Sequence, residues 1–109
     1  MPRTVALPKG TGELSEASID AAGAGDNTII AAVAGQTIRV FKLFAIAASS
    51  VAVIAKDGAS TNLTGAMTLG SIALDYDERP WFTCTVGNAF VLNLGGAVQV
   101  SGRAYYIQG

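Results

Sequence analysis

The stretch GAGDNTIIAAVAGQTIRV, which runs from Gly23 to Val40, shows in miniature the pattern that the whole chain repeats. Its first five residues are the small and polar types that turns favour. Residues 28–33 are apolar and rich in β-branched side chains, and residues 37–40 resume that pattern after a turn around Gly35. The stretch therefore predicts two strands joined by a tight turn, and it leaves no polar side chain over for catalysis.

The same alternation of strands and turns continues to the end of the chain and predicts eight or nine short strands. In the third of them, Arg39 and Lys42 interrupt the alternation, which indicates a β-bulge. Ser49 and Ser50 are expected to turn the chain between two core strands, and Asp57-Gly58 is the clearest signal for a tight turn. The expected strands are residues 14–21, 27–33, 37–47, 50–56, 61–64, 66–74, 81–86, 89–94 and 98–107.

A strand every 8–12 residues or so is typical of a β-sandwich or barrel. We therefore predict an all-β fold, an antiparallel β-sandwich, in which the apolar positions of alternating strands form the core. No stretch has the 3.6-residue period of an amphipathic helix, although residues 15–22 could form a short one. The positions expected to be buried are Ile38, Val40, Val51, Val53, Phe90, Leu92, Val98 and Val100.

The length of 109 residues is typical of one domain, which we place at residues 13–109. Residues 1–12 are predicted to be an extended N-terminal arm, because Pro2 and Pro8 disfavour regular pairing. The arm is apolar at residues 5–7, which is unusual for a segment that stays in water. A frayed terminus is the alternative interpretation.

Charged residues make up only 14% of the chain, against about 25% in an ordinary domain. Such a shortage suggests that further copies or a partner cover part of the surface; an ordinary β domain with a neutral polar surface is the alternative. The seven basic residues are scattered and the net charge is −1, so we expect no direct binding to nucleic acid. The longest apolar stretch, residues 43–55, is too short to span a bilayer, and we expect no membrane partner.

The sequence offers little material for catalysis or metal binding. Cys84 is the one cysteine and the chain has no histidine, so we expect a buried, inert thiol and no enzyme activity. Asp75, Asp77 and Glu78 could hold a hard cation, but a solvated loop with Arg79 as counter-ion is the favoured interpretation. We therefore expect no metal and no cofactor.

Three aromatic side chains could stack on sugar rings, namely Trp81, Tyr105 and Tyr106. Trp81 follows a proline at the start of a predicted strand, so we expect it to anchor the core instead. For Asp26, likewise, a role in a turn is favoured over a role as a ligand.

Several of these segments resemble small virion proteins of tailed bacteriophages: residues 18–40, Asp57-Gly58, residues 63–65, the loop entering residues 81–83 and the closing residues 98–106. The resemblance covers about residues 14–109, and its motifs are structural rather than catalytic. It implies a jelly-roll β-sandwich of the decoration (cement) type, which sits as a trimer on the outside of a capsid. The same fold also serves in tails and fibres.

From the resemblance we expect a structural virion protein that binds and stabilises the outer capsid surface. Its expected partners are copies of itself, as a trimer, and the major capsid protein or other virion subunits; its expected location is the capsid surface, after synthesis in the host cytoplasm. Another virion part, or a module that binds carbohydrate or the host surface, is the alternative. The residues expected to contact the partner lie in the arm: Arg3, Val5, Ala6, Leu7 and Lys9.

Overall fold

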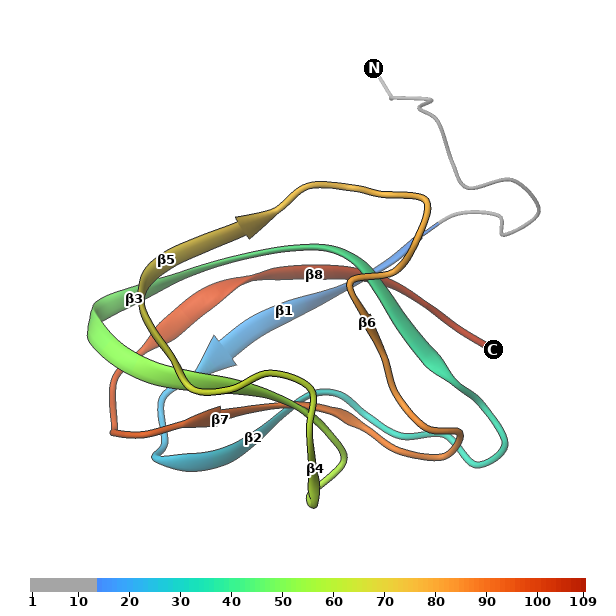
Figure 1. The fold of residues 1–109 in the computed structure, drawn as a ribbon, viewed down its shortest axis with the longest axis horizontal. Helices are drawn as coiled ribbons and strands as arrows, with labels where there is room; N and C mark the ends of the chain where they lie inside the picture. The colour runs from blue at the N-terminus through green and yellow to red at the C-terminus, as the bar shows by residue number, and fades with distance from the viewer. Residues whose placement is uncertain (1–13) are drawn as a thin grey trace.

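The computed structural model describes residues 14–109, which form eight strands and no helix. Every strand pair is antiparallel, and hydrogen bonds connect all eight strands into one sheet (Figure 1). The prediction of an antiparallel all-β fold is therefore confirmed. The strands are β1 (Ser15–Ala21), β2 (Gly25–Ile30), β3 (Ile38–Asp57), β4 (Thr61–Asn62), β5 (Met67–Leu74), β6 (Phe82–Thr83), β7 (Phe90–Leu94) and β8 (Val100–Gln108).

The 20-residue strand β3 lies at the centre of the sheet and organises the other strands. Along one edge it pairs first with β8 and then with β7, and along the other edge with β6, β5 and β4. The amide of Ala48 donates to Gln99 and that of Gly95 donates to Ala52, each at 2.8 Å, so the first edge stays bonded between β8 and β7. β1 and β2 pair in turn with the far sides of β8 and β7.

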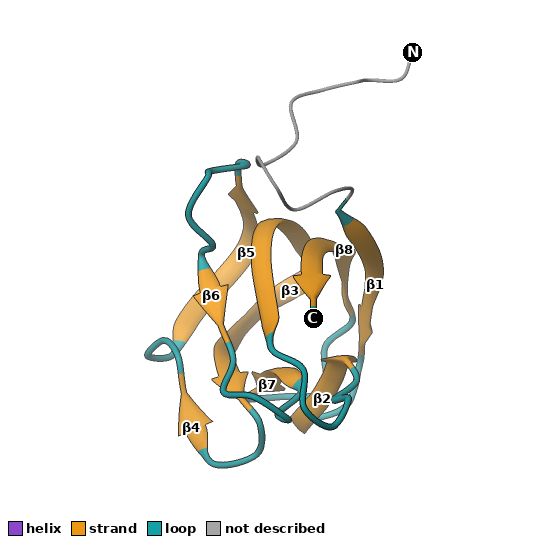
Figure 2. Cartoon of the chain, turned by 90° about the vertical axis from the view of Figure 1, so that its right-hand side faces the viewer, coloured by secondary structure: helices purple, strands orange, loops and turns teal. Residues whose placement is uncertain are grey.

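The sheet curls around its own concave face like half a barrel, as Figure 2 shows. The concave face holds the core, which includes Ile38, Val40, Val53, Phe90 and Val100 at 2% exposure or less. All eight predicted core positions pack in this cluster, although Val98 is only partly buried. A single curled sheet supports the β-rich prediction, but it does not confirm the finer prediction of a jelly-roll sandwich.

Of the two local predictions for β3, the bulge is confirmed and the turn is wrong. The pairing with β8 shifts between Val40 and Lys42, which is the predicted bulge, and Phe41 is the extra residue. The predicted turn at Ser49-Ser50 is wrong, because β3 continues through both residues. The ladder to β5 is interrupted there, between Ile46 and Val51, and on the other edge the ladder to β8 ends at Ala47 before that to β7 begins at Val53. The serines therefore lie at a bend of one strand rather than between two strands.

Gly102 of β8 marks the closest approach of two backbones in the bent sheet. A Cβ at this position would overlap the carbonyl oxygen of Phe44 and lie only 2.8 Å from the Cα of Ala45. Gly102 pairs directly with Ala45, so a side chain on residue 102 would push the central strand away. The glycine therefore permits the tight contact between β8 and β3.

Candidate functional site

The five residues predicted to contact a partner, Arg3, Val5, Ala6, Leu7 and Lys9, all lie outside the described residues. Their role stays a prediction. Within residues 14–109, the surfaces open to a ligand or partner are the exposed face of the sheet and the loops.

The most distinctive surface feature is an apolar patch on the convex face of β3. Phe44 is 40% exposed and Ile46 is 59% exposed, although both lie mid-strand. They point outward because Leu43 and Ala45, which alternate with them, point into the core. Together they border a shallow hollow of about 400 Å³, lined by Phe44, Ile46, Ala48, Gln99, Ser101 and Gly102, which we call the outer patch.

The surroundings of the outer patch differ on its two sides. Toward β5, the residues opposite Phe44 and Ile46 are the small Ala73 and Ser71. Toward β1 the face becomes polar: Arg103 pairs with Glu16, and Gln99 donates to Asp20 at 2.7 Å. The outer patch is thus shallow and mainly apolar, a surface suited to contact with another macromolecule rather than to chemistry.

Trp81 is the second exposed aromatic feature, and its predicted role as a core anchor is wrong. Its side chain is 47% exposed and donates from Nε1 to the carbonyl of Asp75 at 2.8 Å. Phe82 takes the inward position instead and stacks on Phe90, with ring centroids 5.5 Å apart. Trp81 borders an open hollow of about 310 Å³, together with Asp77, Arg79 and Pro80.

The other two candidate aromatic residues, Tyr105 and Tyr106, lie next to each other in β8. Lys42 Nζ lies 5.2 Å from the ring centroid of Tyr105, a cation–π contact, and Tyr106 packs against the core. These contacts give both tyrosines a structural role.

The acidic loop at residues 75–79 is arranged as a turn. Asp77 Oδ1 accepts a hydrogen bond from the amide of Arg79 at 3.0 Å, and Tyr76 stacks on Phe41 with centroids 6.2 Å apart. The ion pairs found among residues 14–109 are Lys56–Asp26 and Arg103–Glu16, so the expected pairing of Arg79 is not seen there. Across the same residues, no three or more His, Cys, Asp or Glu side chains come together as a metal site would require.

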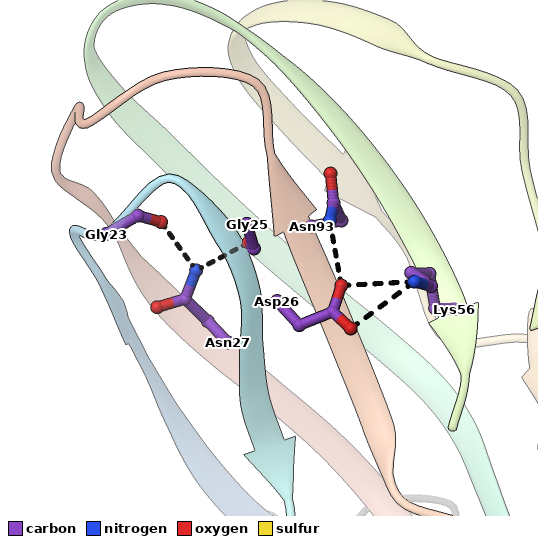
Figure 3. Close-up of polar contacts among 6 residues, drawn as sticks. All are labelled: Gly23, Gly25, Asp26, Asn27, Lys56 and Asn93. Atoms are coloured by element: carbon purple, nitrogen blue, oxygen red, sulfur yellow. Dashed lines mark hydrogen bonds and ion pairs between the residues drawn. The ribbon is translucent and has the colours of Figure 1, made fainter. Parts of the chain in front are cut away.

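Asp26, which the sequence predicts to form a turn, lies in β2 and joins three strands instead (Figure 3). Its carboxylate accepts hydrogen bonds from Asn93 Nδ2 at 2.7 Å and from Lys56 Nζ at 3.1 Å. These two hydrogen bonds lower the pKa of Asp26 below its ordinary value. Beside it, Asn27 Nδ2 donates to the carbonyls of Gly23 and Gly25 and closes the turn between β1 and β2.

Asp57 is a buried carboxylate that the sequence marked only as part of a turn. Only 5% of the residue is exposed, yet its oxygens accept from the amide and hydroxyl of Thr85, at 2.9 and 2.7 Å, and from Asn88 Nδ2 at 2.9 Å. Burial raises the pKa of Asp57, but the hydrogen bonds outweigh burial and bring the pKa below the ordinary 3.8. Asp57 therefore fixes the turn before β7 to the end of β3.

Cys84 lies beside this turn and is 2% exposed, which confirms the predicted burial. Burial, together with the nearby charge of Asp57, raises the pKa of the thiol to about 11. The thiol is therefore protonated near neutral pH, whereas nucleophilic chemistry needs the thiolate.

The described part of the chain thus offers two exposed features, the outer patch and the Trp81 hollow, and its buried polar groups serve the fold. Residues 14–109 contain no helix of the length and apolar character needed to cross a membrane. Comparison with protein-family models, with curated proteins and with solved structures found no match to this chain.

Proposed function

We propose that the chain is a structural virion protein of a tailed bacteriophage, a decoration protein that attaches to the outer capsid surface and stabilises it. In this proposal it is made in the host cytoplasm, associates with further copies of itself and has no enzyme activity. The observation that carries the proposal is the outer patch, where Phe44 and Ile46 expose 40% and 59% of their surface. The side chains beside them are small toward β5 and charged toward β1.

The order of the strands supports the jelly-roll part of the proposal. In an eight-stranded jelly roll the first strand pairs with the last and the second with the last but one, in two sheets of four. Here β1 pairs with β8 and β2 with β7. If β3 and β5 are each divided at the bend, one sheet would contain β1, β8, the first half of β3 and the second half of β5. The other sheet would contain β2, β7, the second half of β3 and the first half of β5.

The outer patch can supply adhesion without any charged contact. Covering the exposed parts of Phe44 and Ile46 would stabilise attachment by about 1–3 kcal/mol per copy, because each side chain is already about half buried. A contribution of this size is weak alone. It becomes tight attachment when several linked copies bind one particle at once.

The N-terminal arm is proposed to add to this attachment. Residues 5–7 are apolar and could lie on a neighbouring subunit, and Arg3 and Lys9 could pair with acidic groups of the capsid. Each exposed ion pair would contribute only about 0–1 kcal/mol. The trimer that the resemblance implies stays a prediction, tested by sedimentation.

Particles of the phage that encodes the chain, prepared without this protein, test the proposal directly. Phe44→Ser combined with Ile46→Ser should lower the occupancy of added protein by at least tenfold. Val86→Ser is the matched control, because Val86 is 56% exposed but lies in the turn before β7, away from the outer patch. If the double variant folds and binds as fully as the control, the outer patch is not the attachment surface.

A module that binds carbohydrate is the second candidate function, and the exposed Trp81 is the observation that favours it. The indole is held by its bond to Asp75 and lies beside the polar Asp77 and Arg79, an arrangement that can stack on a sugar ring and bind its hydroxyls. Calorimetric titration of host surface glycans into the protein tests this candidate. It requires saturable binding that Trp81→Ala abolishes.

A further inference from the structure

Asp57 and Gly58 form the most chemically labile dipeptide of the chain. In an Asp-Gly pair the glycine nitrogen can attack the aspartate side chain, because glycine has no side chain that hinders the approach. The sequence contains this pair once and contains no Asn-Gly pair, which would react in the same way. Asp57-Gly58 is therefore the place where the chain is most open to spontaneous rearrangement.

The rearrangement converts aspartate into isoaspartate in two steps. The Gly58 nitrogen forms a bond to Cγ of the protonated Asp57 side chain, and the carboxyl hydroxyl leaves with the amide proton as water. Hydrolysis of the resulting five-membered ring at the main-chain carbonyl of Asp57 returns the water and leaves the chain running through Cγ. The product has one more methylene in its backbone, and its free carboxylate is attached directly to Cα.

The fold nevertheless requires both residues at this turn. Gly58 has a φ of +70°, and a Cβ added to it would lie 3.2 Å from Cγ and Nδ2 of Asn88. Asp57 is 5% exposed, and its carboxylate holds the turn before β7 through hydrogen bonds from Thr85 and Asn88. A less reactive pair at these positions would lose one of these two features.

Backbone contacts hold the two reacting atoms out of position. The Gly58 amide donates to the carbonyl of Ala89 at 2.8 Å, so the attack requires that this hydrogen bond breaks first. The Asp57 backbone pairs with Phe90 of β7 and with Thr61 of β4, which keeps it extended. The five-membered ring can close only if this backbone rotates about ψ out of the extended region, and that rotation would break both pairings.

Side-chain contacts act in the same direction. The amide and hydroxyl of Thr85 and the Nδ2 of Asn88 donate to the Asp57 carboxylate at 2.7–2.9 Å. These hydrogen bonds fix the side chain and outweigh its burial, so that the pKa of Asp57 lies below 3.8. At neutral pH the side chain is then ionised, whereas ring closure needs the protonated acid, from which water can leave.

We propose that Asp57-Gly58 is a site of isoaspartate formation that the native contacts keep unreactive, so that the pair rearranges only when the turn opens or the chain unfolds. The extra methylene would disturb the pairing of β3 with β4 and β7, and the displaced carboxylate would no longer reach Thr85 and Asn88. Unfolded chains would thus lose the ability to refold as isoaspartate accumulates. The proposal does not rest on the virion function and holds for the isolated protein.

Isoaspartate formation near neutral pH tests the proposal, with an L-isoaspartyl methyltransferase to count isoaspartate and peptide mapping to locate it. Residue 57 of the native protein should rearrange at least about tenfold more slowly than in a synthetic peptide of residues 53–62 in the same buffer. Asn88→Ala removes one donor to Asp57 and should raise the native rate by at least about threefold. The matched control is Asn93→Ala, which removes a similar donor from Asp26 and should keep the wild-type rate.

Refolding provides a second measurement that is decisive even if Asn88→Ala does not fold. Wild-type chains held in urea and then diluted should refold in a fraction that falls in step with isoaspartate at residue 57. A native rate within about threefold of the peptide rate overturns the proposal, and so does full refolding of chains that carry isoaspartate there. Equal acceleration by Asn88→Ala and Asn93→Ala would overturn the assignment of the protection to the contacts of Asp57.

Discussion

Replacing Gly102 by alanine is expected to destabilise the fold by about 3 kcal/mol, at the upper end of the cost of overpacking. The new methyl group would overlap the carbonyl oxygen of Phe44 and lie 2.8 Å from the Cα of Ala45. Both atoms belong to the backbone of β3, which is hydrogen-bonded to β8 on one side and to β5 on the other. No side chain can rotate to relieve the contact, so the sheet itself must shift.

Urea denaturation at one fixed protein concentration measures this effect. A slope of about 1–3 kcal/mol per M converts the loss into a midpoint lower by about 1–3 M. Gly96→Ala is the control, because a Cβ there meets no atom within 4 Å; it should change stability by less than about 1 kcal/mol. If Gly102→Ala unfolds within about 0.5 kcal/mol of the wild type, the close approach of β8 and β3 is not as described.

Three further predictions concern the buried polar groups and the arm. Asp57→Asn should cost about 2 kcal/mol at pH 7, because an amide nitrogen would face donors of Thr85 and Asn88. Since the folded pKa of Asp57 lies below 3.8, its contribution to folding stability is present above about pH 4 and is lost as the pH falls through the folded value. In denaturant titrations the variant should therefore lose less stability than the wild type between pH 6 and 3. Equal losses would exclude Asp57 as the source of this pH dependence. Cys84 should resist thiol reagents in the native protein at pH 8 and react once it is denatured, and rapid native labelling would contradict its burial. Deletion of residues 1–12 should leave the domain folded but lower its occupancy on particles, and undiminished binding would show that the arm takes no part in attachment.

The sequence predicted most of what depends on local alternation. In β3 the β-branched pairs Ile38 and Val40, and Val51 and Val53, are each two residues apart, so the alternation alone was enough to place them in the core. The bulge was also predictable, because Arg39 and Lys42 lie three residues apart and cannot both point outward from a regular strand.

The remaining features depend on contacts between distant segments, which alternation does not describe. Ser49 and Ser50 have the composition of a turn, but hydrogen bonds from Ala48 to Gln99 and from Gly95 to Ala52 hold the chain extended on both sides of them. The apolar run around Phe44 is compatible with burial on both faces, so it gave no sign that one face is exposed. Asp57 looked like a turn residue because its partners, Thr85 and Asn88, lie about thirty positions away.

Cryo-electron microscopy of the encoding phage, with and without the gene for this chain, tests the proposed capsid attachment most directly. We expect extra density on the outer capsid surface of wild-type particles, into which the curled sheet fits with Phe44 and Ile46 facing the capsid. Particles without the gene should lack that density and release their genome at a lower temperature. Identical reconstructions of the two capsids would contradict the attachment.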